Sequence, residues 1–143
     1  MIKLILGDCL EEMKKIPDKS IDLVLTDPPY GTTSCSWDKV VNLQLLRIEL
    51  KRICRGGYVL TSSQPFTTDL INSNRKEFKY CWIWNKKLAG NGILAKKQPL
   101  KIHEDVCVFG SMNYSPEMKF GKKRIKGGIV DKHGTFGNAF SKK

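Results

Sequence analysis

The sequence predicts an α/β fold with an open, mostly parallel sheet and an antiparallel strand at one edge. Over residues 1–75, short apolar runs alternate with segments of helical periodicity, and two strand-type runs then follow without a helix between them. The apolar run at residues 23–25 is continuous rather than alternating, which is typical of a strand buried on both faces of a parallel sheet. At 143 residues and 41% apolar content, the chain has the size of one compact domain.

The first half of the chain contains two predicted strands and two predicted helices. The strands are the apolar runs at residues 2–7 and 20–27. The helix between them carries Leu, Met and Ile at helical spacing and ends at Pro17. A longer helix within residues 40–57 has its apolar residues on one face, and the Gly56–Gly57 pair is expected to end it.

The second half adds three predicted strands and one short helix. Residues 58–62 form a strand, and Pro65 then opens a helix that continues to Ile71. Two further strands are predicted at residues 78–84 and 105–110, joined by a long loop. Because no helix separates these two strands, the last one is expected to be antiparallel. The three tryptophans are assigned to the core.

Polar residues stand where three of these strands end, at Asp8, at the run Asp27–Tyr30 and at the turn Ser62–Gln64. Ligands of open α/β sheets bind beyond the carboxyl ends of the strands, so these residues are predicted to line one crevice. The run Asp-Pro-Pro-Tyr is the most specific of the three. Two successive prolines fix the backbone and donate no hydrogen bond, and they stand between a carboxylate acceptor and an aromatic face. This set suits a flat ligand that carries an amino group, such as an extruded base.

The charge of the chain is strongly positive. Lys and Arg number 25 against 14 Asp and Glu, which gives a net charge of +11 and a pI near 9.5. Such an excess favours an anionic partner, most often nucleic acid, although a merely soluble, lysine-rich surface is an alternative. Residues 119–143 hold eight Lys or Arg against one acid, Asp131, and are predicted to form a flexible basic arm or a solvated tail.

The cysteine pattern and the apolar profile exclude several classes of protein. The five cysteines are widely spaced, without a C-x-x-C pair, so neither a disulfide framework nor a zinc site is predicted. No signal peptide and no run long enough to cross a membrane is found in the sequence. The sequence therefore predicts a cytoplasmic protein without a membrane contact or a metal.

At these residues the chain resembles the amino-methyltransferases of DNA, and in particular their circularly permuted group, often found in bacterial restriction–modification systems and phages. Five segments occur in the order usual for this family: LILGDCLEEM, SIDLVLTDPPYG, GYVLTSSQPF, FKYCWIWNK and KKQPLKIHEDVCVF. The resemblance extends to about residue 118. It implies a catalytic portion with a Rossmann-like sheet over residues 1–112, and the start of a target-recognition region over residues 113–143.

The resemblance also implies a cofactor, a substrate and site residues. The cofactor is S-adenosylmethionine and the substrate is double-stranded DNA, in which a base is flipped out and methylated on its exocyclic amino group. The catalytic residues are then Asp27, Pro28, Pro29 and Tyr30. Asp8, Cys9 and Asp27 face the cofactor, although a helix cap is an equally ordinary role for Asp8. The residues that contact DNA are Asn91, Lys96, Lys97, Lys101, Lys122, Lys123 and Arg124; Asn91 could instead serve only a turn.

The chain departs from the family pattern in one respect. The glycine-rich F-x-G-x-G turn of the cofactor pocket is not found, and TFGNAF at residues 135–140 does not replace it. Three alternatives follow: the sheet closes differently in this chain, a second polypeptide or a second copy completes it, or the chain is a truncated, catalytically silent DNA-binding fragment. An Asp at position 27 favours adenine N6 over cytosine N4. It also disfavours RNA or a protein glutamine as acceptor, because those relatives usually carry Asn there.

Overall fold

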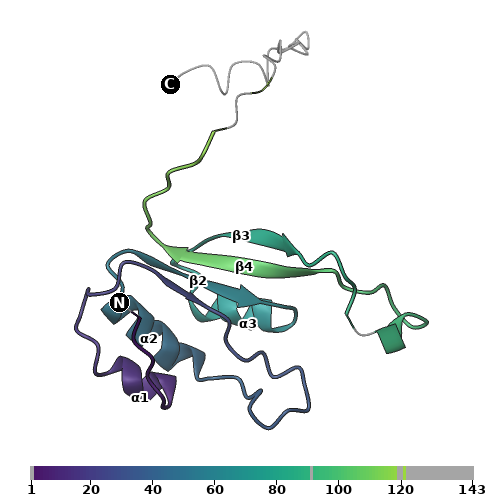
Figure 1. The fold of residues 1–143 in the computed structure, drawn as a ribbon, viewed down its shortest axis with the longest axis horizontal. Helices are drawn as coiled ribbons and strands as arrows, with labels where there is room; N and C mark the ends of the chain where they lie inside the picture. The colour runs from purple at the N-terminus through teal and green to yellow at the C-terminus, as the bar shows by residue number, and fades with distance from the viewer. Residues whose placement is uncertain (1, 91, 119–120, 122–143) are drawn as a thin grey trace. The chain divides into compact units, whose positions relative to one another are not determined.

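The computed structural model describes residues 2–90, 92–118 and 121. The chain divides into two units, residues 1–113 and 114–143, and the described helices and strands all lie in the first. Its centre is a four-stranded sheet in the order β1-β2-β4-β3 (Figure 1). The strands are β1 (Val24–Thr26), β2 (Gly57–Ser62), β3 (Phe78–Asn85) and β4 (His103–Gly110).

The sheet is mixed, so the prediction of a mostly parallel sheet is wrong. Among the described strands only β1 and β2 form a parallel pair, whereas β4 is antiparallel to both of its neighbours, β2 and β3. The reason is the connection between β3 and β4, which is a loop without a crossover helix and therefore returns the chain in the opposite direction. The antiparallel last pair is as predicted. Because β4 inserts between β2 and β3, the antiparallel strand is not at an edge as predicted, and the two edges of the sheet are β1 and β3.

Three helices lie on one side of the sheet (Figure 1): α1 (Cys9–Met13), α2 (Leu43–Ile53) and α3 (Phe66–Ser73). The amide groups of Gln44 and Leu45 donate to the Asn42 side chain, which caps α2. The predicted glycine stop of α2 is wrong: the helix ends at Ile53 and Cys54 is already extended, so that Gly57 begins β2 instead. The core between α2, α3 and the sheet consists of buried apolar residues, among them Leu46, Leu50, Leu60, Leu70 and Phe109.

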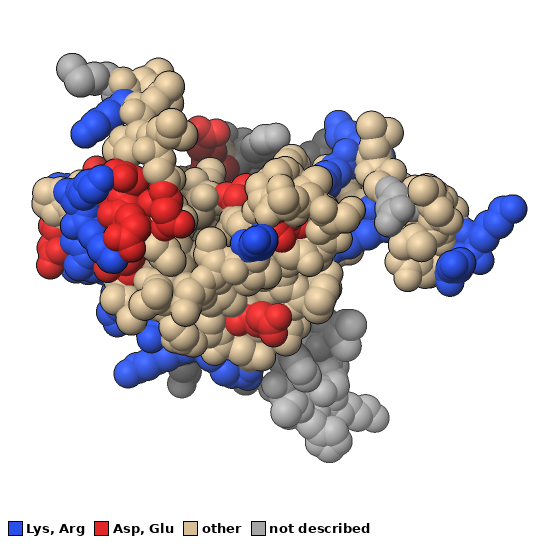
Figure 2. All heavy atoms as spheres, turned by 90° about the horizontal axis from the view of Figure 1, so that it is seen from below, with Lys and Arg blue, Asp and Glu red and all other residues tan. Residues whose placement is uncertain are grey.

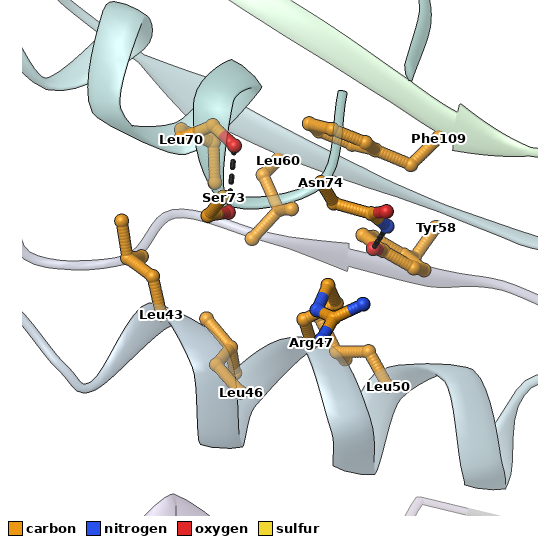
Figure 3. Close-up of a pocket in the computed structure, with 10 residues that line it drawn as sticks. All are labelled: Leu43, Leu46, Arg47, Leu50, Tyr58, Leu60, Leu70, Ser73, Asn74 and Phe109. Carbon is orange, nitrogen blue, oxygen red and sulfur yellow. Dashed lines mark hydrogen bonds between the residues drawn. The ribbon is translucent and has the colours of Figure 1, made fainter. Parts of the chain in front are cut away.

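Figure 3 shows how α2 and α3 meet the sheet around a small cavity of about 10 Å³. Side chains of both helices point toward Tyr58 and Leu60 of β2 and Phe109 of β4. The Asn74 amide donates to the Tyr58 hydroxyl at 2.7 Å, so this buried hydroxyl is satisfied. Arg47 Nε has no protein partner among the described residues, and a water molecule in the cavity would provide one.

The predicted first strand, residues 2–7, is not a strand. Ile2, Leu4 and Leu6 are at least 90% exposed, and none of them pairs with β1. An apolar, extended segment becomes a strand only where a neighbour offers a row of backbone partners. β1 is paired only on its β2 side, so its other edge is open and residues 2–7 run free of the described sheet.

No described helix lies on the sheet face opposite α1, α2 and α3 (Figure 1). Leu25 of β1 is 67% exposed, so the prediction that this strand is buried on both faces is wrong. The assignment of the tryptophans to the core is also wrong, because Trp37, Trp82 and Trp84 are half or more exposed. Their apolar character predicts burial, but the described residues cover them only in part: the Lys86 ammonium lies 5.8 Å from the centre of the Trp84 ring, and the Tyr80 ring lies 5.4 Å from the Trp82 ring.

Candidate active site

The run Asp27–Tyr30 leaves the sheet directly after the last residue of β1, at the carboxyl end of the β1–β2 pair. Asp27 is exposed, Pro28 is buried, and Pro29 and Tyr30 are half-buried. Since neither proline needs a hydrogen-bond acceptor for its nitrogen, the chain can turn out of the strand without leaving a donor unsatisfied. The backbone therefore presents a carboxylate at the rim of the sheet while the prolines anchor it.

Asp27, Tyr30 and Thr61 form one hydrogen-bonded cluster. The Tyr30 hydroxyl lies 2.6 Å from Asp27 Oδ1 and 2.9 Å from Thr61 Oγ1, and the Thr61 hydroxyl donates to the same Asp27 oxygen. Burial raises the pKa of Tyr30, and the hydrogen bond to Asp27 raises it further, so the phenol stays protonated. Both hydroxyl contacts end on Oδ1, which leaves Oδ2 of this exposed carboxylate for another donor.

The Tyr30 ring stacks on Phe66, the first residue of α3. The ring centroids are 5.2 Å apart and the planes differ by 23°. Phe66 is only 2% exposed, so it belongs to the core and packs against one face of the Tyr30 ring. Tyr30 is thus fixed at two places, its hydroxyl by Asp27 and Thr61 and one ring face by Phe66.

The loop that follows Tyr30 is organised around the carboxylate of Asp38. Residues 31–37 are all exposed, whereas Asp38 is 8% exposed. Its oxygens accept hydrogen bonds from the amides of Gly31, Thr32 and Thr33 at 2.8, 2.9 and 2.7 Å. The Thr33 hydroxyl adds a fourth at 2.7 Å. Together the hydroxyl and these amides lower the pKa of Asp38 to about 2.

This depressed pKa predicts a specific dependence of stability on pH. Because the folded-state pKa of Asp38 lies below the ordinary value of 3.8, the carboxylate contributes its stability above about pH 4 and loses it as the pH falls toward about 2. We expect the urea midpoint of the parent to fall more steeply over this range than that of Asp38→Asn, which has no carboxyl group to titrate. Parallel midpoint profiles for the two proteins would contradict the assignment.

Asp8 and Cys9 lie at the start of α1. The Asp8 carboxylate caps this helix, accepting from the amides of Leu10 and Glu11 at 2.9 and 3.3 Å, and Cys9 is exposed. Asp8 also lines an open hollow of about 500 Å³ together with residues of α1 and α2, among them Leu10, Leu45 and Ile48. The predicted crevice is thus supported only in part: Asp27 and the end of β2 meet through Thr61, whereas Asp8 faces α1 and α2.

The predicted DNA-contacting lysines of the described chain lie in the loop between β3 and β4. Lys96 and Lys97 are exposed beside the short 3₁₀ helix Gly92–Leu94. The Lys101 ammonium donates to Ser63 Oγ at 2.7 Å, which brings this end of the loop next to the end of β2. At the base of the loop, Lys86 pairs with Glu104 at 2.6 Å. The other predicted contacts lie outside the described residues: Asn91, Lys122, Lys123 and Arg124.

Charges of both signs are mixed on the helical side of the molecule. Figure 2 shows acidic and basic side chains side by side over the α1 region, at the left of that view. They include the exposed pairs Lys14–Glu11 and Lys15–Glu12, and the pair of Arg52 with Asp18. Residues 1–118 carry 17 Lys and Arg against 13 Asp and Glu. Most of the net positive charge therefore belongs to residues 119–143, almost all of which lie outside the described part.

Two absences hold for the described residues, 2–90, 92–118 and 121. No three of their His, Cys, Asp and Glu side chains come together in a way that could hold a metal ion. None of their helices has the length and apolar character needed to cross a membrane.

Three residues of the site were missed by sequence reasoning: Thr61, Phe66 and Asp38. Thr61 and Phe66 come from β2 and α3, more than 30 positions after Asp27, and only the fold brings them to Tyr30. Asp38 lies in a loop of small and polar residues that gives no periodic signal. An acid that closes a turn rich in Gly, Ser and Thr is the one local hint.

The described sheet, with its helices and the turn after β1, has a methyltransferase fold that is also found in solved DNA modification methylases. One of these is TTHA0409 from Thermus thermophilus, named as a DNA modification methylase, with a TM-score of 0.55 and 18% identity. This match covers 80% of the chain and 56% of that structure. Another is the M1.HpyAVI–SAM complex, with a TM-score of 0.56 and 16% identity over 84% of the chain and 62% of that structure.

Sequence comparison adds one short match. Over 24 residues the chain is 62% identical to the type II methyltransferase M.HinfI from Haemophilus influenzae, which covers 17% of the chain and 7% of that relative. No family model matches the chain. The chain thus spans little more than half of the solved structures to which it is similar.

Proposed function

We propose that this chain is the catalytic-loop portion of an S-adenosylmethionine-dependent DNA methyltransferase that methylates adenine N6 in a flipped-out base. The observation that carries the proposal is the cluster of Asp27, Tyr30 and Thr61 at the end of β1. It presents a carboxylate acceptor beside an aromatic ring, within a fold shared with DNA modification methylases. The short match to the type II methyltransferase M.HinfI supports methyl transfer as the reaction.

The proposed role of the site is to hold an amino group by accepting its hydrogen bonds. The exocyclic amino group donates one hydrogen bond to Asp27, at the oxygen that Tyr30 and Thr61 leave available, and another to the Pro28 carbonyl. These acceptors favour a tetrahedral nitrogen whose lone pair is directed away from the two acceptors and is free to attack the methyl group. The carboxylate also stabilises the positive charge that develops on the nitrogen during methyl transfer.

Tyr30 provides the surface on which the flipped base stacks. Its other face rests on Phe66, and its hydroxyl is held by Asp27 and Thr61. A ring fixed in this way loses little conformational freedom when a base stacks on it. The ring therefore orients the base plane while Asp27 orients the amino group.

The described residues fit only part of a cofactor site. S-adenosylmethionine supplies an electrophilic methyl group when it is bound. Asp8 and Asp27 fit as acceptors for it, and the hollow of Leu10, Leu45 and Ile48 beside Asp8 suits a flat heterocycle. Cys9 is exposed next to this hollow and is kept as a proposed contact. The glycine-rich turn predicted for the rest of such a pocket is not found in the sequence.

The proposal includes a partner that completes the sheet. Three features are left uncovered by the described residues: one edge of β1, the apolar segment 2–6, and the side chain of Leu25. An open edge of this kind pairs readily with another strand. We propose that a further polypeptide segment supplies that strand, from a second polypeptide or a second copy.

The DNA contacts follow from the charge of the loop between β3 and β4. Lys96, Lys97 and Lys101 are proposed to contact phosphates, which gives affinity without base specificity. Asn91 and residues 122–124 remain proposed contacts as well. The alternatives are cytosine N4 as the methylated atom and a catalytically silent fragment that retains DNA binding. The cytoplasm is the proposed location.

Transfer of radiolabelled methyl from S-adenosylmethionine to unmethylated DNA tests the proposal directly. We expect label in DNA from the 143-residue chain, either alone or with a polypeptide that carries the glycine-rich turn added in trans. Acid hydrolysis of the labelled DNA distinguishes N6-methyladenine from N4-methylcytosine. No label under either condition, together with salt-dependent DNA binding, would favour the silent fragment.

A further inference from the structure

The loop of residues 31–40 returns to its starting point immediately after Tyr30. Gly31 has a φ of +68°, and a Cβ added at this residue would lie 2.8 Å from Val40 Cγ2. The first and last residues of the loop are therefore in contact, as in a compact Ω-loop. Its residues 31–37 are exposed, so packing against the core does not hold it in place.

The Asp38 carboxylate holds this loop together instead. Three consecutive amides, of Gly31, Thr32 and Thr33, point at its two oxygens, and the Thr33 hydroxyl joins them. Successive amides that converge in this way form a nest for an anion. Here the anion belongs to the chain itself, and charge-assisted bonds of this length are among the stronger ones in proteins.

The first of these bonds acts on Tyr30. The amide of Gly31 belongs to the peptide bond that follows Tyr30, so its hydrogen bond to Asp38 Oδ1 fixes the plane of that peptide. On the preceding side, Pro28 and Pro29 restrict the backbone. The backbone of Tyr30 is therefore held from both sides, independently of the contacts that its side chain makes with Phe66 and Asp27.

We propose that Asp38 is a positioning residue for the methyl-transfer site, which acts by holding the Tyr30–Gly31 peptide and thereby the Tyr30 ring and hydroxyl. The inference rests on the proposed function and adds a residue to it. Asp38 itself touches neither Asp27 nor Tyr30 through its side chain in the described contacts; it acts through the backbone. Its removal should therefore affect turnover more than the affinity for DNA.

Asp38→Asn is the variant that tests this role. Asparagine has nearly the same shape, but it is uncharged and has only one accepting oxygen. Its NH₂ group cannot accept from the amide of Gly31 if it takes the place of Oδ1, nor from those of Thr32 and Thr33 if it takes the place of Oδ2. We expect the kcat for methyl transfer to fall roughly 10- to 100-fold, because a misplacement of about 1 Å costs that much. The KM for DNA should change by less than about threefold, at a temperature well below the unfolding transition of both proteins.

A second measurement does not depend on activity. In protein with ¹³Cζ-labelled tyrosine, the Tyr30 resonance reports the hydrogen bond of its hydroxyl, and Tyr30→Phe identifies that resonance. We expect Asp38→Asn to shift or broaden it, while the Tyr58 resonance of the core stays unchanged. An unmoved Tyr30 resonance would overturn the proposal whether or not the chain transfers methyl groups, whereas a moved resonance in an inactive chain would contradict only the proposed function.

Asp22→Asn is the matched control. Asp22 precedes β1, is exposed, and pairs with Arg55 at 2.8 Å on the surface, where an ion pair has little effect on stability. The control should leave both the kcat and the Tyr30 resonance unchanged. Equal losses of kcat in Asp22→Asn and Asp38→Asn would overturn the assignment to Asp38.

Discussion

Replacement of Asp27 by alanine lowers the rate of methyl transfer to DNA by roughly 100- to 1,000-fold, the effect expected when one preorganised electrostatic contact to a transition state is removed. In the proposed function, the carboxylate accepts from the substrate amino group and stabilises the charge that develops on it. Alanine also removes the acceptor of the Thr61 and Tyr30 hydroxyls. The measurement is the initial rate of label transfer at saturating cofactor and DNA, under the condition in which the parent is active.

Asp27→Asn separates the charge from the hydrogen bond. It keeps one accepting oxygen but no negative charge, so its rate should lie between those of the parent and Asp27→Ala. Because Asp27 is exposed, neither variant leaves a hole in the core. Asp27→Ala should lose about 0.5–1.5 kcal/mol of unfolding free energy per hydrogen bond removed from the Tyr30 and Thr61 hydroxyls, and Asp27→Asn, which keeps an accepting oxygen, should lose less. If Asp27→Ala keeps more than about a tenth of the parental rate, the carboxylate is not the acceptor proposed here.

The local elements of this fold could be predicted from the sequence because their signals are local. α2 shows a one-sided apolar pattern, and Leu46, Leu50 and Ile53 from that pattern are buried. The strands β2, β3 and β4 coincide with apolar runs between turn residues. The directions of the strands could not be predicted equally well. They depend on where β4 inserts, which is a relation between segments far apart along the chain, such as Leu60 and its partner Cys107.

Residues 2–7 show the limit of pattern reasoning most clearly. Their apolar character predicts a buried strand, but burial requires a partner, and no described segment pairs with them. The same reason applies to Leu25, Trp82 and Trp84, whose exposed faces lie on the uncovered side of the sheet. The apolar pattern predicts that these residues are buried. The described structure shows that the chain itself buries them only in part.

The candidate site also has a part that could be predicted from the sequence and a part that could not. The run Asp27–Tyr30 is contiguous and chemically unusual, so its place at the end of a strand could be predicted. Its supports are ordinary residue types that lie far along the chain or in an irregular loop. Thr61 and Phe66 reach Tyr30 only because β2 lies next to β1 and α3 begins just after β2. The motif predicts which groups act, and the fold shows which residues contact and hold them.

Replacement of Tyr30 by alanine should weaken the use of DNA by roughly 5- to 150-fold in kcat/KM, which corresponds to the roughly 1–3 kcal/mol that stacking of one base on an aromatic side chain contributes. Tyr30→Phe keeps the ring on Phe66 and loses only the hydroxyl contacts with Asp27 and Thr61. We therefore expect it to retain most of the parental kcat/KM on unmethylated DNA. Tyr80→Ala is the control, because Tyr80 is a similarly exposed tyrosine (41%) on β3, outside the proposed site.

The comparison between these variants decides which part of Tyr30 acts. The ring carries the function if Tyr30→Ala is strongly impaired while Tyr30→Phe and Tyr80→Ala are not. If Tyr30→Phe is as impaired as Tyr30→Ala, the hydroxyl carries it instead, through its bond to Asp27, and the base does not rely on the ring for its orientation. In that case Phe66 supports a hydrogen-bond donor rather than a stacking surface. Phe66→Leu, which removes the stacked partner but keeps an apolar side chain, should then leave kcat/KM nearly unchanged, whereas a stacking role requires that it falls.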